Sequence, residues 1–239
     1  MENEMTSRKS IARLAGLLYL FWIISGLFSM YYVTSKINLV GDASAAVQDI
    51  LSNEILFRTS IVNGLVNCTI WIFMVLIFYR LFKSVNEGQA RLLFAFVIVQ
   101  VPLSIISEAF SITSLMIAKG EVLKTFDLSQ KQELSLLFIK INDSVVSALV
   151  LFWGLWLFPL GILTYRSRFL PRFLGVWLII DGVALVVLSI IGLLFPQYKD
   201  ITFKIAFPAM LGEVAFMLWL LIKGTKNNMQ TITNQTAQK

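Results

Sequence analysis

Four carboxylic acids lie inside long apolar stretches, and they are the strongest candidates for chemistry: Glu108, Asp143, Asp181 and Glu213. An ionisable group in hydrocarbon costs at least about 2.5–3.5 kcal/mol, so each is by default a functional hypothesis. With a rise of about 1.5 Å per helical residue, the acids fall into two layers. Glu108 and Asp143 lie towards the outer side of the membrane, and Asp181 and Glu213 lie nearer the inner side at almost one depth.

The inner acids, Asp181 and Glu213, have no basic residue at their depth in their own apolar segments. If these segments are neighbours, two carboxylates share a region of low dielectric constant. At least one is then expected to hold a proton near pH 7, because desolvation and like charge both disfavour full ionisation. A proton or monovalent cation between them is the functional interpretation. Alternatively, each carboxyl reaches the interface or bonds a hydroxyl such as that of Ser25 or Ser189.

The outer acid Glu108 lies on a polar helical face, because the spacing of the neighbouring polar residues follows the helical period. Arg58 falls at a similar depth and is a candidate counter-charge, and Asn63 belongs to a matching polar stripe. Together with Asp143 they predict an outer polar binding site. A structural ion pair and small polar residues that only pack helices together are equally open interpretations. The face of Glu108 comprises Gln100, Ser104, Ser107, Ser111 and Ser114.

The amino-acid composition indicates that much of the protein surface faces lipid, and it excludes several kinds of active site. Of 239 residues, 57% are hydrophobic and 14% are charged, whereas a soluble domain carries about 25% charge. The chain has no histidine and one cysteine, Cys68. These counts exclude zinc sites of His and Cys, histidine-ligated haem, histidine-based triads and an intrachain disulfide. No cofactor, metal site or catalytic motif is predicted, so an enzyme is less favoured than a non-enzymatic membrane protein.

The elements that position these residues are six segments long enough to cross a bilayer as helices. The sequence therefore predicts an all-α, polytopic membrane helix bundle. It forms one domain over residues 1–224, followed by a disordered tail over 225–239. The predicted spans are about 11–33, 55–79, 91–117, 136–163, 173–195 and 202–222.

Charge asymmetry sets the expected orientation. Twelve of the 20 basic residues, but only three of the 14 acidic residues, lie on the side that carries both termini. Basic residues in short loops favour the cytoplasmic side, so both termini are predicted to be cytoplasmic. The net charge of +6 does not indicate nucleic-acid binding, because the basic residues lie in short loops between apolar segments.

Two outer connections carry local signals. Gly41-Asp42 is a turn signal, and the following residues 45–53 read as a short amphipathic helix at the interface. Asp127 or Ser129 is a plausible N-cap for a helix that runs into the fourth span.

Short motifs also occur in order along residues 12–224, nearly the whole chain. They are ARLAGLLYL at 12–20, Gly41-Asp42, EILFR at 54–58, YRLF at 79–82, YRSRFLPRFLG at 165–175 and GEVAFMLWLLIKG at 212–224. In order and spacing they resemble the DUF4386 family of bacterial multi-pass membrane proteins. The resemblance implies several spans, a bacterial cytoplasmic membrane and no assigned function. It supplies no catalytic residue, but it draws attention to Arg58, Arg172 and Glu213.

The leading functional hypothesis is an integral membrane protein that handles a small molecule, lipid or ion through a polar intramembrane site. Its expected partners are the lipid bilayer and a small-molecule, lipid or proton ligand. The rival hypothesis is a non-catalytic accessory or sensor protein whose buried polar residues are structural. A membrane enzyme is third, because the outer carboxylates have no recognisable catalytic partners.

Overall fold

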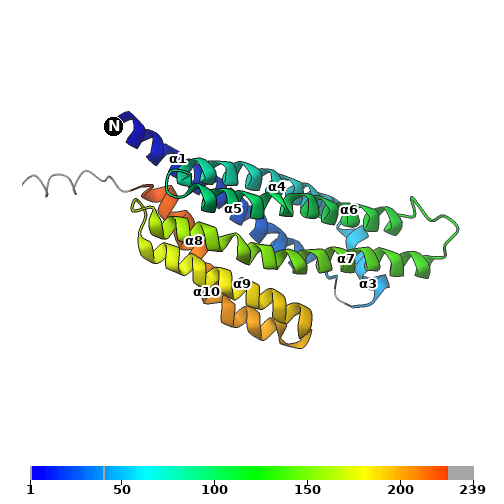
Figure 1. Ribbon diagram of the computed structural model, residues 1–239. Coiled ribbons are helices and arrows are strands. Elements are labelled where there is room, and N and C mark those ends of the chain that lie inside the picture. Colours follow the sequence, from blue (N-terminus) through cyan, green and yellow to red (C-terminus); the bar gives the residue numbers. More distant parts are fainter. Residues whose placement is uncertain (1, 40, 226–239) are drawn as a thin grey trace, which may run out of the picture. The chain divides into compact units, whose positions relative to one another are not determined.

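The computed structural model describes residues 2–39 and 41–225, and these residues form helices, turns and loops without strands (Figure 1). The predicted all-α architecture is confirmed. The tail predicted from residue 225 lies, apart from Thr225, outside the described residues. The helices are α1 (Glu2–Leu27), a π-helical turn (Phe28–Val33), α2 (Thr34–Lys36), α3 (Ala43–Ser52), α4 (Glu54–Phe82), α5 (Glu87–Ile98), α6 (Gln100–Ala118), α7 (Leu128–Leu155), α8 (Leu157–Arg166), α9 (Arg172–Leu194), a 3₁₀ turn (Pro196–Tyr198) and α10 (Lys199–Ile222).

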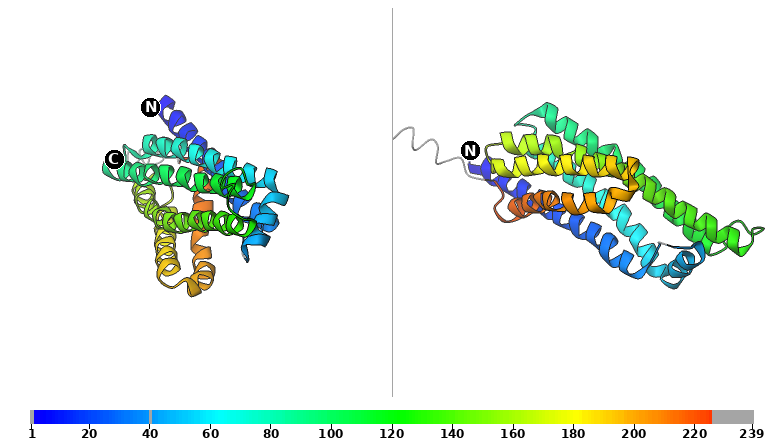
Figure 2. Two further views of the ribbon diagram at one scale, coloured as in Figure 1. Left: turned by 90° about the vertical axis from the view of Figure 1, so that its right-hand side faces the viewer. Right: turned by 90° about the horizontal axis from the view of Figure 1, so that it is seen from below.

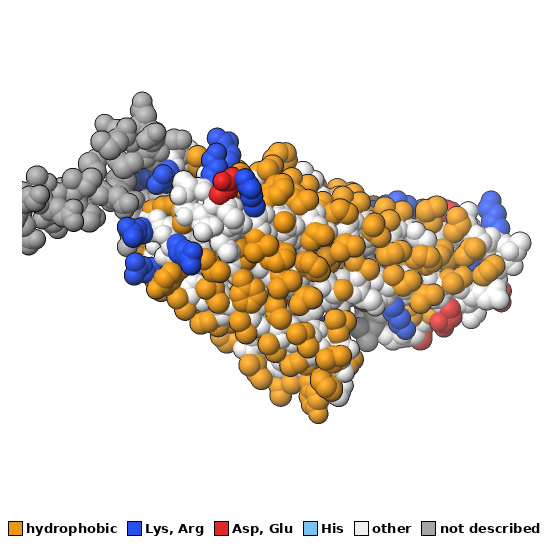
Figure 3. All heavy atoms as spheres, in the orientation of Figure 1, with side chains coloured by type: hydrophobic (Ala, Val, Ile, Leu, Met, Phe, Trp, Pro, Cys, Tyr) orange, Lys and Arg blue, Asp and Glu red, His pale blue; other side chains and the backbone are white. Residues whose placement is uncertain are grey.

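Six helical segments are long and apolar enough to span a membrane, as predicted. They are Arg8–Lys36, Glu54–Phe82, Glu87–Ala118, Leu128–Arg166, Arg172–Leu194 and Pro196–Ile222. Figure 3 shows orange hydrophobic side chains over most of the visible face, with a group of blue lysine and arginine side chains towards its left-hand end. The chain is therefore a multi-pass membrane protein whose apolar side chains face lipid.

Two of the spans are interrupted by proline. The third span breaks between α5 and α6, and the fourth breaks between α7 and α8. α5 ends at Ile98 and α7 at Leu155, each four residues before Pro102 or Pro159. Proline has no N–H to donate to the carbonyl four residues earlier, and its ring crowds that carbonyl, so the α-helical ladder is interrupted there. α10 continues through Pro208 without such a break.

Aspartate N-caps start the helices at both connections: Asp127 was a predicted cap, whereas Asp42 was predicted only as part of a turn. Asp42 accepts a hydrogen bond from the Ala45 backbone N–H at 2.8 Å and starts α3. Asp127 accepts the Gln130 N–H at 2.8 Å and precedes α7, which runs into the fourth span as expected. A side-chain oxygen at the N-cap satisfies one of the free N–H groups of the first turn.

The chain forms two compact units. The first comprises the described parts of residues 1–20, 73–97 and 150–225, and the second comprises 21–72 and 98–149. In the first unit, α9 packs against both α8 and α10, which lie beside it in Figures 1 and 2. In the second unit, α3 closes an apolar core formed by Ile37, Ile50, Phe57, Ile61, Leu115 and Ile139. One domain over residues 1–224 stays a prediction.

Candidate intramembrane carboxylate site

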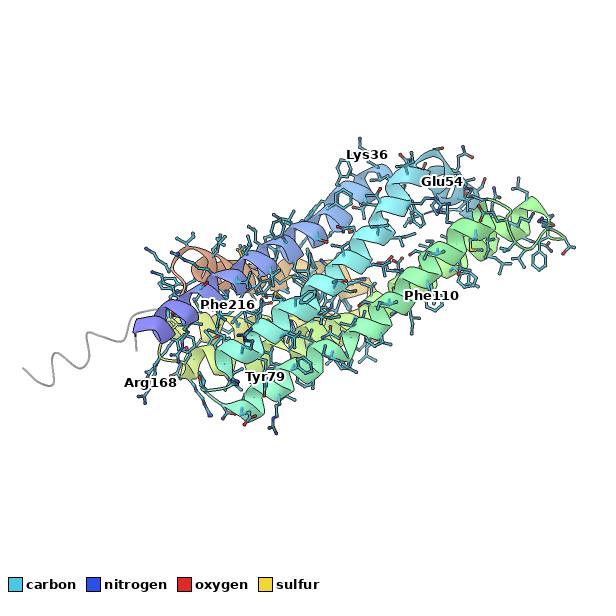
Figure 4. All side chains as sticks on the ribbon, turned by 90° about the horizontal axis from the view of Figure 1, so that it is seen from above. Lys36, Glu54, Tyr79, Phe110, Arg168 and Phe216 are labelled. Carbon is cyan, nitrogen blue, oxygen red and sulfur yellow. The ribbon has the colours of Figure 1, made fainter. Side chains whose placement is uncertain are left out.

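Glu213 on α10 is held by a tyrosine from the first span. The Tyr19 hydroxyl on α1 donates a hydrogen bond to Glu213 Oε2. The tyrosine is completely buried, with the ring centroids of Phe78, Trp156 and Phe216 lying 6.0, 6.0 and 6.3 Å from its own. Phe216 is labelled in Figure 4, one turn beyond Glu213 on the same helix. This aromatic cage fixes the phenol, so Glu213 has a positioned hydrogen-bond donor within an apolar region.

Asp181 on α9 is the least satisfied polar group in this unit. Its exposed fraction is 0%, and neither carboxylate oxygen has a hydrogen-bond partner among the residues that the structure describes. α9 packs against α10, so Asp181 and Glu213 lie on neighbouring helices. A buried polar group without a partner costs about 1–3 kcal/mol, and more when charged. Ionising a fully buried acid without a partner is therefore unfavourable.

Close glycine contacts bring these side chains together. A methyl carbon added at Gly16, one turn before Tyr19, would lie 2.6 Å from the Leu221 nitrogen of α10. The same addition at Gly212, next to Glu213, would lie 2.7 Å from Trp177 Cδ1 of α9. Without side chains at these two positions, α1 and α9 can both approach α10 closely, as small residues allow in membrane helix packing.

A second glycine seam lies beside Asp181. Gly154 faces Gly182, with an added methyl carbon 2.6 Å from the Gly182 carbonyl oxygen. Gly161, seven residues later on α8, faces Gly175, seven residues earlier on α9, and the corresponding distance is 2.7 Å. The seven-residue interval returns to the same helix face, so the two pairs form one antiparallel seam. This seam fixes the position of α9 and hence that of Asp181.

The predicted pairing of Arg58 with Glu108 is wrong. Arg58 Nε instead bonds Glu54 Oε1 at 2.8 Å, and that oxygen also accepts Lys119 Nζ at 2.9 Å. Glu108 lies against Gly64, where an added methyl carbon would overlap its carboxylate. Gly64 is six residues, or about 9 Å, further along α4 than Arg58. Arg58 therefore lies at the end of α4, and no ion pair of Glu108 is found in the described chain.

The other polar residues of the second unit bond to one another. Asn63 Nδ2 donates to the Ser25 carbonyl and to Ser29 Oγ, both at 2.9 Å. Ser25 Oγ donates to Asn63 Oδ1 at 2.9 Å, so Ser25 is a partner of Asn63 and not of an inner acid. Asp143 is exposed on α7, while the adjacent Asn142 donates to the Ser107 carbonyl at 2.8 Å. These bonds join neighbouring helices of the second unit.

The sequence predicted a shared site for Asp181 and Glu213, but it did not identify Tyr19 or Asn142. The signal for Tyr19 was a hydroxyl in an apolar segment, one turn after a glycine that permits close packing. Its partner lies 194 residues away, so spacing could not identify it. No group of three or more Cys, Asp or Glu side chains is arranged for a metal ion within residues 2–39 and 41–225.

This architecture defines a multi-pass helical membrane protein with a buried aspartate, Asp181, and a part-buried glutamate, Glu213, on neighbouring helices. The family model described as "Domain of unknown function (DUF4386)" matches residues 14–224, and the chain belongs to this family. It is also 30% identical over 92 residues to an uncharacterised protein of Archaeoglobus fulgidus, a match that covers 36% of this chain and 54% of the archaeal one. The chain thus spans about half the length of that relative. No solved structure matches it.

Proposed function

We propose that this protein binds a proton or a small monovalent cation between Asp181 and Glu213, and that this binding accompanies the handling of a small molecule, lipid or ion. The observation that carries the proposal is the complete burial of Asp181 without a hydrogen-bond partner in the described chain. A group that served only packing would be satisfied by neighbours, since buried polar groups usually are.

The chemistry of the three side chains fits one small positive ion. Two carboxylates in a low-dielectric region repel each other when both are ionised, and one proton or cation removes that repulsion. The Tyr19 hydroxyl donates a hydrogen bond to one carboxylate oxygen of Glu213. The other Glu213 oxygen and both Asp181 oxygens are chemically suited to share the ion. Intramembrane carboxylates commonly mark ion pathways and proton relays.

The test is ion flux in proteoliposomes. Vesicles containing the full chain and a pH-sensitive dye are given a proton, Na⁺ or K⁺ gradient, and the variants Glu213→Gln and Asp181→Asn are compared with the unmodified protein. Asp200→Asn is the matched control, because Asp200 is an exposed acid in the first turn of the same α10. We expect flux in the unmodified protein and the control, and its loss in both site variants. Flux that persists in Glu213→Gln, or none with any of the three ions, would contradict the proposal.

A second candidate is a non-catalytic accessory or sensor protein whose polar residues hold the bundle together. The satisfied network of Asn63 with Ser25 and Ser29 favours it, because such bonds stabilise helix packing without a ligand. It predicts that Glu213→Gln and Asp181→Asn change thermal stability without altering any ion-dependent signal. It also predicts that the isolated protein is less stable than the protein within its native membrane.

Two further features of the function are part of the proposal. Glu108, seated against Gly64 without an ion pair among the described residues, is the candidate for a second polar site with Asn63. The resemblance to the DUF4386 family supports a bacterial cytoplasmic membrane, and the basic residues near the ends of the spans support both termini inside the cell. A reporter that fluoresces only in the cytoplasm, fused at the C-terminus, tests this orientation; a dark fusion that is present at normal abundance would contradict it.

A further inference from the structure

The connection between α8 and α9 is a short loop that is held in place by hydrogen bonds and by buried side chains. Ser167 Oγ donates to the Thr164 carbonyl at 2.8 Å and accepts the Leu170 N–H at 3.3 Å. Phe169 and Leu170 are each 3% exposed. Arg166 and Arg168 flank the buried Ser167 and are exposed. The buried residues therefore fix the loop in one conformation and direct two guanidinium groups outward; Figure 4 labels Arg168 at this end of the helices.

Arg168 has a backbone conformation that an arginine rarely adopts. Its φ is +59°, in the left-handed region that glycine enters at no steric cost. Strained residues of this kind are concentrated at binding sites, where the surrounding structure holds them in place. A glycine here would relieve the strain but would remove the guanidinium, so the presence of arginine suggests that its side chain has a role.

Two more arginines are held beside this loop by aromatic rings. The Arg8 guanidinium carbon lies 5.3 Å from the centre of the Phe169 ring, and that of Arg172 lies 5.4 Å from the centre of Tyr165. A guanidinium resting on a ring keeps its N–H groups available for an anion. Within the described chain, no carboxylate forms an ion pair with any member of this arginine cluster, which comprises Arg8, Arg166, Arg168 and Arg172.

We propose that the arginine cluster binds the phosphate of an anionic phospholipid headgroup. The cluster lies at the ends of membrane-spanning helices, next to apolar side chains that face lipid: Phe173 is 56% exposed and Tyr165 is 43% exposed. Guanidinium groups one turn or less from lipid-facing rings lie at headgroup depth, where aromatic and basic side chains anchor a protein. Arginine suits this partner because its planar donors match two phosphate oxygens at once.

The experiment measures lipid binding by the full chain in detergent micelles, with phosphatidylglycerol or phosphatidylcholine added and retained lipid counted by native mass spectrometry. The test variants are Arg168→Gly, which relieves the backbone strain, and Arg166→Gln. Arg91→Gln is the matched control, because it removes the same charge from the same unit but its guanidinium pairs with Glu87 at 2.8 Å.

We expect the unmodified protein and Arg91→Gln to retain phosphatidylglycerol in preference to phosphatidylcholine. Each test variant should bind phosphatidylglycerol about five-fold more weakly, the effect of one basic residue near an anionic surface. The proposal is overturned if Arg168→Gly binds as well as the unmodified protein, or if Arg91→Gln weakens binding equally. Displacement of the lipid by an equal concentration of inorganic phosphate would indicate a free-phosphate site and would also overturn it.

Discussion

Adding one methyl group at Gly154 should push α7 away from α9 at the glycine seam. In Gly154→Ala, the new carbon would lie 2.6 Å from the Gly182 carbonyl oxygen and 2.9 Å from the Val186 nitrogen. Both atoms belong to the backbone, so neither can rotate away as a flexible side chain could. The helices must instead shift, and Gly182 lies next to Asp181, so the shift also disturbs the carboxylate site.

The expected magnitude combines two opposing effects. Overpacking a well-packed contact costs about 1–3 kcal/mol, while replacing glycine by alanine inside a helix stabilises by about 0.5–1 kcal/mol. Gly154→Ala should therefore lower the free energy of unfolding by up to about 2.5 kcal/mol. The matched control is Gly26→Ala, because Gly26 is helical and exposed and an added methyl carbon there meets no atom within 4 Å. That variant should gain about 0.5–1 kcal/mol.

Thermal unfolding in a mild detergent measures both variants. For a chain of this size, 1 kcal/mol shifts the melting temperature by about 2–4 °C. Gly154→Ala should melt below the unmodified protein and Gly26→Ala at or above it. If Gly154→Ala is as stable as Gly26→Ala, the seam between Gly154 and Gly182 is not a close helix contact, and the positioning argument for Asp181 fails.

Two further predictions concern the second unit. Replacing the N-cap in Asp42→Ala should destabilise α3 by about 1 kcal/mol, because the bond to the Ala45 N–H is lost; faster amide hydrogen exchange in α3 without a change elsewhere checks it, and unchanged exchange would refute it. The hydrogen bond from Lys119 to Glu54 raises the pKa of that lysine above its ordinary 10.5. Its small stabilising contribution is thus present at neutral pH and is lost as the pH rises through the raised value. Thermal unfolding across this pH range should show the loss in the unmodified protein but not in Lys119→Gln.

Local features of the fold could be predicted from the sequence because they depend on neighbours in the chain. The length of each apolar segment decides that it spans the bilayer, since hydrocarbon leaves no water for backbone groups. Pro102 and Pro159 disrupt hydrogen bonding four residues earlier, and Asp42 and Asp127 cap helices three residues ahead. The nearly equal depth of Asp181 and Glu213 likewise follows from counting residues along two helices.

The partners of the buried groups were decided only by tertiary structure. Glu213 is bonded by Tyr19 because Gly16 lets α1 approach α10, and the sequence does not show which helix packs there. Arg58 was expected to pair with Glu108 on another helix, but it pairs with Glu54, four residues earlier on its own helix. Hydrophobicity determines which segments enter the membrane, but lipid contacts all apolar faces alike. Close contacts between small residues therefore select the helix neighbours, and through them the composition of the site.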